Sequence, residues 1–423
     1  VRAISSFPPK KYDCMWSNSI LWIKRRYHRI VNSIAFYPAF IALLFLVLSF
    51  GMIVFDFSEA GKQIKLTLSW LTLKDASTAR SIISAIAAGV ISLAVFSFSM
   101  VMIVLNQAAS QMSNRVLDKL IGNRFQQVVL GIYIGTIVYA LFLLSTIRDI
   151  NSGVYVPALS TYLLIAITIF DIFLFIYFLH YITQSVKYEV IIQRICKETN
   201  AVLKRSCKLE KEEPETGPLQ NDHHIHAVES GIYEGFNALN LVKLCDENDC
   251  SVYLMHVPGT FILRGLPLAQ LSKPLPDEAR EEMRKSIFLH DSETIEENFF
   301  YGFRQLAEVA IKALSPGIND PGTAIISLRS LFSLLTYRAH HFPENTIVND
   351  KDQVRIFTNT LSFEKIFEHT ILPIWSYGKN DRMIAWELHH LLAQLYVISP
   401  NASVKALLTE VKQVMVEHHL FKE

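Results

Sequence analysis

This sequence has no excess of positive or negative charge, and it has few cysteines. Lysine and arginine number 40 against 39 for aspartate and glutamate, so the formal net charge is +1. Without a basic excess the chain lacks the electrostatic footprint of nucleic-acid binding, and we expect no nucleic-acid partner. Its five cysteines form no CxxC pair. This usage is typical of a reduced, cytosol-facing protein, and it favours stray thiols over a Cys245–Cys250 disulfide.

The sequence fingerprints of common enzyme classes are also missing. We find no GxSxG nucleophile elbow, HExxH motif, P-loop or GxGxxG. Three histidines at 223, 224 and 226 lie in a charged linker, where the chain offers no fixed ligand geometry. We therefore expect no catalytic activity, no metal and no cofactor.

Long apolar runs are what the sequence does contain. Hydrophobic residues make up 51% of the chain. Four apolar stretches, at roughly 34–55, 82–105, 127–147 and 159–182, reach the ~20 residues that a membrane-spanning helix needs. Buried helices of a large soluble core are the alternative, but four such runs so close together favour a membrane protein. We therefore predict a membrane α-helical fold with four transmembrane helices and a cytoplasmic α+β domain.

Basic residues are distributed unequally between the two sides of these spans. One side carries Arg2, Lys10, Lys11, Lys24, Arg25, Arg26, Arg29, Arg115, Lys119, Arg124, Lys187, Arg194 and Lys197. The other side carries Lys62, Lys65, Lys74, Arg80 and Arg148. Loops rich in lysine and arginine stay in the cytoplasm, so the pattern predicts that both termini are cytoplasmic. We expect no cleavable signal peptide, because the basic N-terminal segment leads directly into a full-length span.

A stripe of small, mildly polar residues follows one face of the second apolar stretch. Its members recur at alternating steps of four and three, the spacing of a single helix face. They are Ser81, Ala85, Ala88, Ser92, Val95, Ser99, Met102 and Asn106. Small residues let helices pack closely, which is the interpretation we favour. The same stripe also suits the lining of a water-filled path shared between subunits.

Asp171 is a carboxylate deep in the fourth apolar stretch. An ionisable residue at this depth is costly and by default a functional hypothesis. It either binds a cation or carries a proton, or it is a neutral carboxylic acid bonded to a nearby hydroxyl such as that of Tyr139 or Ser145. The sequence leaves these alternatives open.

The remaining chain divides by composition into further segments. We predict a cytoplasmic N-terminal segment at 1–33, a four-span transmembrane domain at 34–182 and a helical stalk with linker at 183–225. A small β-rich module follows at 226–295, and a cytoplasmic helical bundle at 296–423. Within the module, two β-rich runs flank the Pro-Gly turn at 258–259, which predicts a hairpin.

Two Pro-Gly pairs interrupt the helical bundle in the stretch "ALSPGINDPGTA" at 313–324. The helix-corner motif comprises Ser315, Pro316, Gly317, Asn319, Asp320, Pro321 and Thr323. Pro316 ends the preceding helix, Asp320 is placed to cap the next helix, and Pro321 suits its first position. The helix start is either a small-anion site or a rigid corner, and we favour the corner because Asp320 already neutralises it.

The same stretch resembles the most recognisable motif of a bacterial predicted-membrane-protein family, domain of unknown function 2254. The segments "NQAASQMSNRVL", "VVLGIYIGTIVYAL", "SGIYEGFN" and "VPGTFILRGLPL" also resemble parts of this family. The likeness covers most of the chain after about residue 30. It implies a multi-pass protein of the bacterial inner (plasma) membrane, and it implies no particular activity.

Two classes of function fit these features better than an enzyme does. In the first, the chain is a homo-oligomeric channel- or transport-like protein whose subunits share a path along the stripe and whose cytoplasmic domain is regulatory. In the second, it is a non-conducting scaffold or sensor whose cytoplasmic domain binds a partner or small anion. The expected partners are the lipid bilayer, further copies of the chain and an unknown small ligand.

The predicted topology can be tested directly. A reporter enzyme that is active only outside the cytoplasm, fused after Glu423, should give no signal, because the 13-to-5 distribution of basic residues places that end inside. The same reporter inserted after Lys74 should be active. A strong signal from the C-terminal fusion would overturn the topology.

Overall fold

A computed structural model describes residues 35–67, 73, 75–111, 124–150, 153–185, 187–211 and 222–417. They divide into two compact units: the first ends at Val186 and the second runs from Lys187 onward. The predicted segment 1–33, part of the linker at 212–221 and the last six residues lie outside the described residues.

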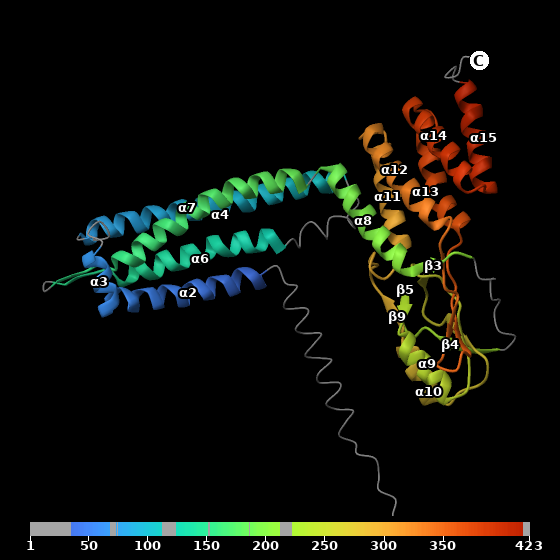
Figure 1. The fold of residues 1–423 in the computed structure, drawn as a ribbon, viewed down its shortest axis with the longest axis horizontal. Helices are drawn as coiled ribbons and strands as arrows, with labels where there is room; N and C mark the ends of the chain where they lie inside the picture. Colours follow the sequence, from blue (N-terminus) through green and yellow to red (C-terminus); the bar gives the residue numbers. More distant parts are fainter. Residues whose placement is uncertain are drawn as a thin grey trace, which may run out of the picture. The chain divides into compact units, whose positions relative to one another are not determined.

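The first unit contains the four predicted apolar helices (Figure 1). They are α2 (Phe36–Phe57), α4 (Ala76–Gln111), α6 (Arg124–Thr146) and α7 (Ala158–Ser185). Among the described residues, these four helices are long and apolar enough to cross a membrane, which confirms that prediction. A short helix, α3 (Glu59–Thr67), follows α2, and the hairpin of β1 (Arg148–Ile150) and β2 (Gly153–Tyr155) joins α6 to α7.

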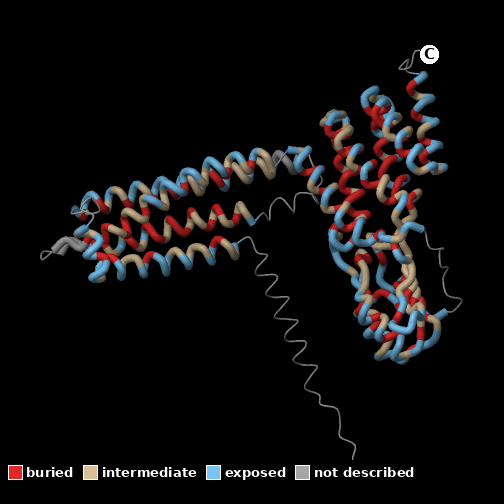
Figure 2. Tube along the Cα trace, in the orientation of Figure 1, coloured by how far each residue is buried: buried red, intermediate tan, exposed pale blue. Residues whose placement is uncertain are grey.

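Helix α6 is the most buried of the four. Of its most apolar 18 residues, 44% are buried, against 11% in α2 and α4 and 17% in α7 (Figure 2). Gly131 and Gly135 allow α2 to approach it closely. A Cβ atom at Gly131 would lie 2.7 Å from Ile41 Cδ1, and one at Gly135 would lie 2.7 Å from Phe45 Cγ. This GxxxG spacing therefore serves helix packing within one chain.

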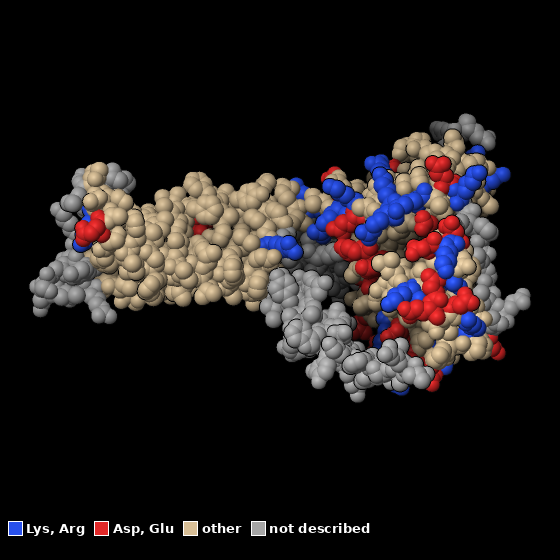
Figure 3. All heavy atoms as spheres, turned by 60° about the horizontal axis from the view of Figure 1, so that its bottom comes forward, with Lys and Arg blue, Asp and Glu red and all other residues tan. Residues whose placement is uncertain are grey.

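The second unit combines a helical bundle with small sheets. The bundle consists of α8 (Tyr188–Ser206), α11 (Phe299–Ala313), α12 (Pro321–Arg338), α13 (Phe363–Gly378), α14 (Arg382–Ile398) and α15 (Ala402–Glu417). Figure 3 shows charged side chains of both signs on this unit, and almost none on the visible face of the first unit between its ends.

Helix α8 corrects the prediction of a stalk, because it packs against α11 and α12. Gly302 of α11 lies so close to α8 that an added Cβ would be 1.8 Å from Thr199 Oγ1. One face of α8 is apolar, with Ile191, Ile195 and Leu203 buried. This face needs a partner, and the bundle supplies it.

Among the described residues, the β-rich part consists of three sheets. A five-stranded sheet has the order β11 (Thr346–Val348), β12 (Val354–Phe357), β6 (Val252–Leu254), β8 (Pro267–Leu271) and β4 (His223–His226). A three-stranded sheet has the order β7 (Phe261–Ile262), β5 (Gly231–Phe236) and β9 (Ile287–His290), and β10 (Phe342–Pro343) pairs with β3 (Cys207–Leu209). Helices α9 (Ala238–Glu247) and α10 (Asp277–Lys285) complete this part.

Two predictions for this part were wrong. The first placed only helices after residue 296, but β10, β11 and β12 lie between α12 and α13, and β12 pairs in parallel with β6. The second was a hairpin around Gly259, but β6 and β7 belong to different sheets. Gly259 has φ +91° and donates its N–H to Tyr233 O at 2.7 Å, so the turn carries the chain across to β5.

Buried apolar side chains from these strands and from α9 and α10 form one core. Cys245 and Cys250 are free thiols within it, as expected for stray core cysteines. Cys250 N–H also donates to Cys245 O at 2.9 Å, at the turn that follows α9.

The α2–α6 contact predicts a specific effect of a single methyl group. Gly135→Ala should destabilise the first unit by about 1–3 kcal/mol, because the new Cβ overlaps the Phe45 ring. Thermal unfolding of the full chain in detergent would show a lower melting temperature. Gly51→Ala on α2 is the matched control, since a Cβ there meets no atom within 4 Å. Equal effects of the two changes would contradict the packing role.

Candidate functional site

The stripe predicted on the second span lies on α4, and the single chain leaves it uncovered. Ser81, Ala85, Ala88, Ser92, Val95, Ser99, Met102 and Asn106 are all exposed. Another face of α4 is buried against α6 and α7, through residues such as Ile83, Ala87 and Val90. In a bilayer the stripe therefore faces either lipid or another protein.

The two central serines of the stripe form hydrogen bonds within their own helix. Ser92 Oγ donates to Ala88 O, and Ser99 Oγ donates to Val95 O, both at 2.9 Å. Such bonds satisfy a hydroxyl in an apolar surrounding without a partner helix. Each oxygen still keeps lone pairs with which it can accept a further hydrogen bond.

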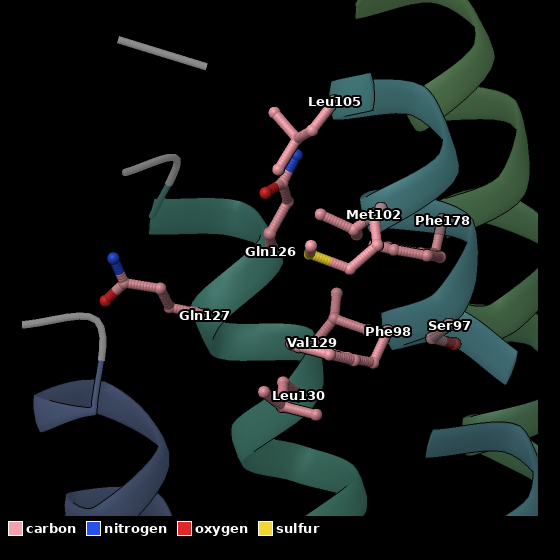
Figure 4. Close-up of a pocket in the computed structure, with 10 residues that line it drawn as sticks. Ser97, Phe98, Met102, Leu105, Gln126, Gln127, Val129, Leu130 and Phe178 are labelled. Carbon is pink, nitrogen blue, oxygen red and sulfur yellow. The ribbon is translucent and has the colours of Figure 1, made fainter. Parts of the chain in front are cut away.

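A lateral cavity of about 240 Å³ lies beside the stripe, between α4 and α6. Figure 4 shows Phe98 and Met102 of α4 facing Val129 and Leu130 of α6 across it, with Gln126 toward Leu105. Met102 belongs to both the cavity lining and the stripe. The mostly apolar lining suits a hydrocarbon chain or an apolar side chain better than an ion.

Asp171 lies near the middle of α7 and is fully buried. Within the described part of the chain, neither of its carboxylate oxygens has a hydrogen-bond partner. The Thr136 hydroxyl of α6 lies beside it, but donates to Ile132 O at 3.0 Å. The two partners suggested from the sequence are engaged elsewhere: Tyr139 donates to Ser160 O, and Ser145 donates to Phe142 O.

Further polar groups surround Asp171 inside the bundle. The Tyr133 hydroxyl of α6 lies close to both Ser97 of α4 and Asp171. The hydroxyls of Ser97 and Tyr133 are buried, and neither has a hydrogen-bond partner among the described residues. Three helices thus direct polar groups to one place in the membrane interior, where an unsatisfied group costs several kcal/mol.

The sequence pattern pointed to Asp171 but not to the residues around it. Tyr133 and Thr136 are three residues apart on α6 and so share one face. This spacing of polar residues within a span was the available signal. Ser97 could not be found in this way, because it lies outside the α4 stripe, on a face whose partner depends on the packing.

A second buried carboxylate, Asp56 at the end of α2, was also missed. Its Oδ1 lies 2.7 Å from Lys65 Nζ, and its Oδ2 accepts hydrogen bonds from Ser160 N at 2.9 Å and Ser160 Oγ at 3.1 Å. Asp56 thereby satisfies a free N–H group in the first turn of α7. It is fully paired and structural, in contrast to Asp171.

The helix-corner motif forms the predicted cap between α11 and α12. Asp320 Oδ1 accepts from Thr323 N at 3.1 Å, and Pro321 occupies the first turn. Asp320 N donates to Ala313 O at 2.8 Å, and Asn319 adopts φ +49°. Burial and then the Asp320 carboxylate raise the pKa of Tyr188, so the corner also lies against the start of α8. Its polar groups bond with one another, as expected of a corner.

The comparison with known proteins agrees with this architecture. The family described as "Predicted membrane protein (DUF2254)" matches residues 31–394, which include all four spans and the corner. The chain belongs to this family.

Relatives of this DUF2254 protein include "Uncharacterized protein Rv1290c" of Mycobacterium tuberculosis (strain H37Rv) and "Uncharacterized protein Mb1321c" of Mycobacterium bovis. Each is 23% identical over 332 residues, covering 74% of this chain. The chain spans about 63% of the length of these relatives. No solved structure matches the chain.

The corner predicts a defined loss on removal of its cap. Asp320→Ala should destabilise the second unit by about 1 kcal/mol, since Thr323 N–H loses its acceptor. Thermal unfolding of the full chain, with hydrogen exchange of the first turn of α12, would measure this. Asp320→Asn should recover most of the loss, and Asp350→Ala, in an exposed loop, should change little. An unchanged melt for Asp320→Ala would refute the cap.

Proposed function

We propose that this DUF2254 protein is one subunit of a homo-oligomeric channel- or transport-like protein of the bacterial inner membrane. Both termini are cytoplasmic in this proposal, the α4 stripes of neighbouring subunits line a shared path, and the second unit is regulatory. The proposal assigns the protein no catalytic activity. The exposure of all eight stripe residues in the single chain is the observation that supports it most.

The position of α4 in the bundle explains why this exposure matters. The other three spans pack around α6, which is the most buried of the four, so we place the path between chains rather than inside one. A helix that faced only lipid would have no need of three serines and an asparagine along one line. Around a common axis, the same residues would be the polar part of the lining.

The composition of the stripe limits what such a path could select. Ser92 and Ser99 are seven residues apart, two helical turns, and Asn106 continues their line. The stripe contains no charged residue, so any ion selectivity would be weak. Val95 and Met102 would be the narrow apolar points, and closing there would occur by dewetting.

Asp171 supports a transport-like role rather than a purely structural one. A carboxylate without a partner in the membrane interior is stable mainly as the neutral acid, or with a bound cation. The carboxylate of Asp56 shows that this bundle can pair an acid fully where stability requires it. Among the described residues Asp171 has no such partners, and this fits a group that takes up and releases a proton or cation.

A non-conducting scaffold or sensor is the second candidate. The serine hydroxyls of the stripe already bond to their own backbone, and this arrangement favours tight helix–helix packing without water. In that case the stripe still holds copies together, but their centre is sealed.

Conductance measurements distinguish the channel from the non-conducting scaffold. Val95→Ser and Met102→Ser should each raise the single-channel conductance of the purified protein in a planar bilayer, because they ease wetting of the apolar points. Ser92→Leu should lower it. Ser145→Leu on α6 is the matched control, since Ser145 is also exposed but lies outside the stripe.

Native gels of the same variants complete the test. An intact oligomer that is electrically silent in wild type and in every variant would reject the channel and favour the scaffold. Smaller species for Ser92→Leu, but not for Ser145→Leu, would assign the stripe to packing alone.

A further inference from the structure

The second unit holds a polar cleft of about 410 Å³, distinct from the stripe and from the corner. Its walls come from β5, from the turn at Val257 and Pro258, from the start of α11 and from residues between 343 and 361. Two segments through which the sequence resembles its family, 230–237 and 257–268, contribute to it. Nothing in the predicted channel or scaffold role assigns a task to this cleft.

Glu234 presents a buried carboxylate to the cleft. Only 9% of its side chain is exposed. Its Oε1 accepts the N–H of Thr294 at 3.0 Å. Its Oε2 lies 3.9 Å from His290 Nε2, which is beyond hydrogen-bond distance, and no donor reaches it from the described residues. This oxygen borders the cleft without a donor from the described part of the chain, so it is available to a ligand that supplies one.

The charge of the lining points to a cation. Glu297 and Glu344 line the cleft together with Glu234, whereas Arg205 is the single basic residue among the described lining residues. The Arg205 guanidinium donates to Glu296 O at 2.8 Å. Three carboxylates against one guanidinium make the cleft acidic, which disfavours the small anion that the sequence analysis considered for the cytoplasmic domain.

The groups next to Glu234 do not neutralise the negative charge of the cleft. Behind it, Glu293 is paired with Arg304 and also accepts from Asn298 Nδ2 at 3.3 Å. Burial is the main cause that raises the pKa of Glu234, the Thr294 N–H and His290 oppose it, and Glu297 and Glu293 add to it. A positive group bound beside Glu234 would oppose this rise, because it stabilises the ionised carboxylate.

The rest of the lining suits an organic ligand rather than a metal ion. Phe236, Phe299 and Phe300 form an aromatic wall, and aromatic faces attract ammonium groups and cover alkyl chains. Within the described residues, no group of three or more histidine, cysteine, aspartate or glutamate side chains could hold a metal ion. The volume lies within the range of small-molecule sites.

We propose that this cleft binds a small organic amine. Its ammonium group donates to Oε2 of Glu234, and its carbon chain lies against the aromatic wall. Glu344 and Glu297, both exposed, attract the amine at the rim. The inference concerns the second unit alone, and it holds whether or not α4 lines a path.

Calorimetric titration of the full chain in detergent tests this, with 1,4-diaminobutane and spermidine as probes. We expect saturable binding of at least one amine. We expect no binding of 1,4-butanediol, which has the same chain length and carries hydroxyl donors in place of the charged ammonium groups, and no binding of inorganic phosphate. Absence of binding by both amines at millimolar concentration would overturn the proposal, as would equal binding of the diol or binding of phosphate in the cleft.

Variants locate the site. Glu234→Gln keeps the shape and the acceptor for Thr294 N–H but removes the charge, so amine affinity should fall about tenfold or more. Glu344→Gln, at the exposed rim, should lower affinity severalfold and serves as the test if Glu234→Gln lowers the melting temperature. Glu247→Gln on α9 is the matched control, since its side chain is 56% exposed and outside the cleft. Unchanged affinity in both Glu234→Gln and Glu344→Gln would place the amine elsewhere.

The dependence of affinity on pH gives a second, independent readout. The amine binds the ionised carboxylate of Glu234, whose pKa is raised in the free protein. Affinity should therefore fall as the pH is lowered, because protonation of Glu234 removes the charge that the amine binds. His290 faces the same carboxylate, with its Nε2 3.9 Å from Oε2 of Glu234. Glu234→Gln should flatten this dependence, and an equally steep dependence in that variant would contradict the proposed contact.

Discussion

The close approach of α2 to α6 is the contact on which the membrane unit depends. At Gly131 and Gly135, α6 carries no side chain, so Ile41 and Phe45 of α2 approach its backbone at these two positions. Between apolar helices in lipid the hydrophobic effect gives little drive, and van der Waals contact has to supply the stability. With α2 in place, Asp56 reaches the first turn of α7, and α6 becomes the helix that the others surround.

Among the described residues of the first unit, the two buried carboxylates differ in their partners. Asp56 is held by an ammonium group and by two donors of Ser160, and its position at a helix start gives it a structural task. Asp171 is equally buried, but the polar groups near it form their bonds elsewhere or form none. In the second unit, Glu234 repeats this pattern, with one oxygen bonded and the other directed to a cleft. Incomplete pairing of buried acids is thus common to the proposed transport site and the proposed amine site.

Local signals in the sequence were sufficient for some features and not for others. Length and apolar composition predicted the four spans, and the Asp-Pro pair at 320–321 predicted the cap of α12, because both depend on neighbouring residues. The failures all depend on distant partners. The strand Val354–Phe357 is parallel to β6, about a hundred residues earlier, and no local pattern signals such a pairing. The same holds for the apolar face of α8, and for the polar groups around Asp171, which come from three helices.

The pairing of β12 with β6 has a consequence for how this part of the protein could be inherited. The chain leaves the β-rich region at α11, passes through two helices of the bundle, and returns to add β11 and β12 to the sheet before it enters α13. Residues 226–295 alone would lack these two strands and expose an open sheet edge at β6, which invites aggregation. Segments of the β-rich region and of the bundle therefore alternate along the chain. Neither part could be exchanged between genes as a separate domain. Any shuffling event in evolution would have to move the β-rich region and the bundle together.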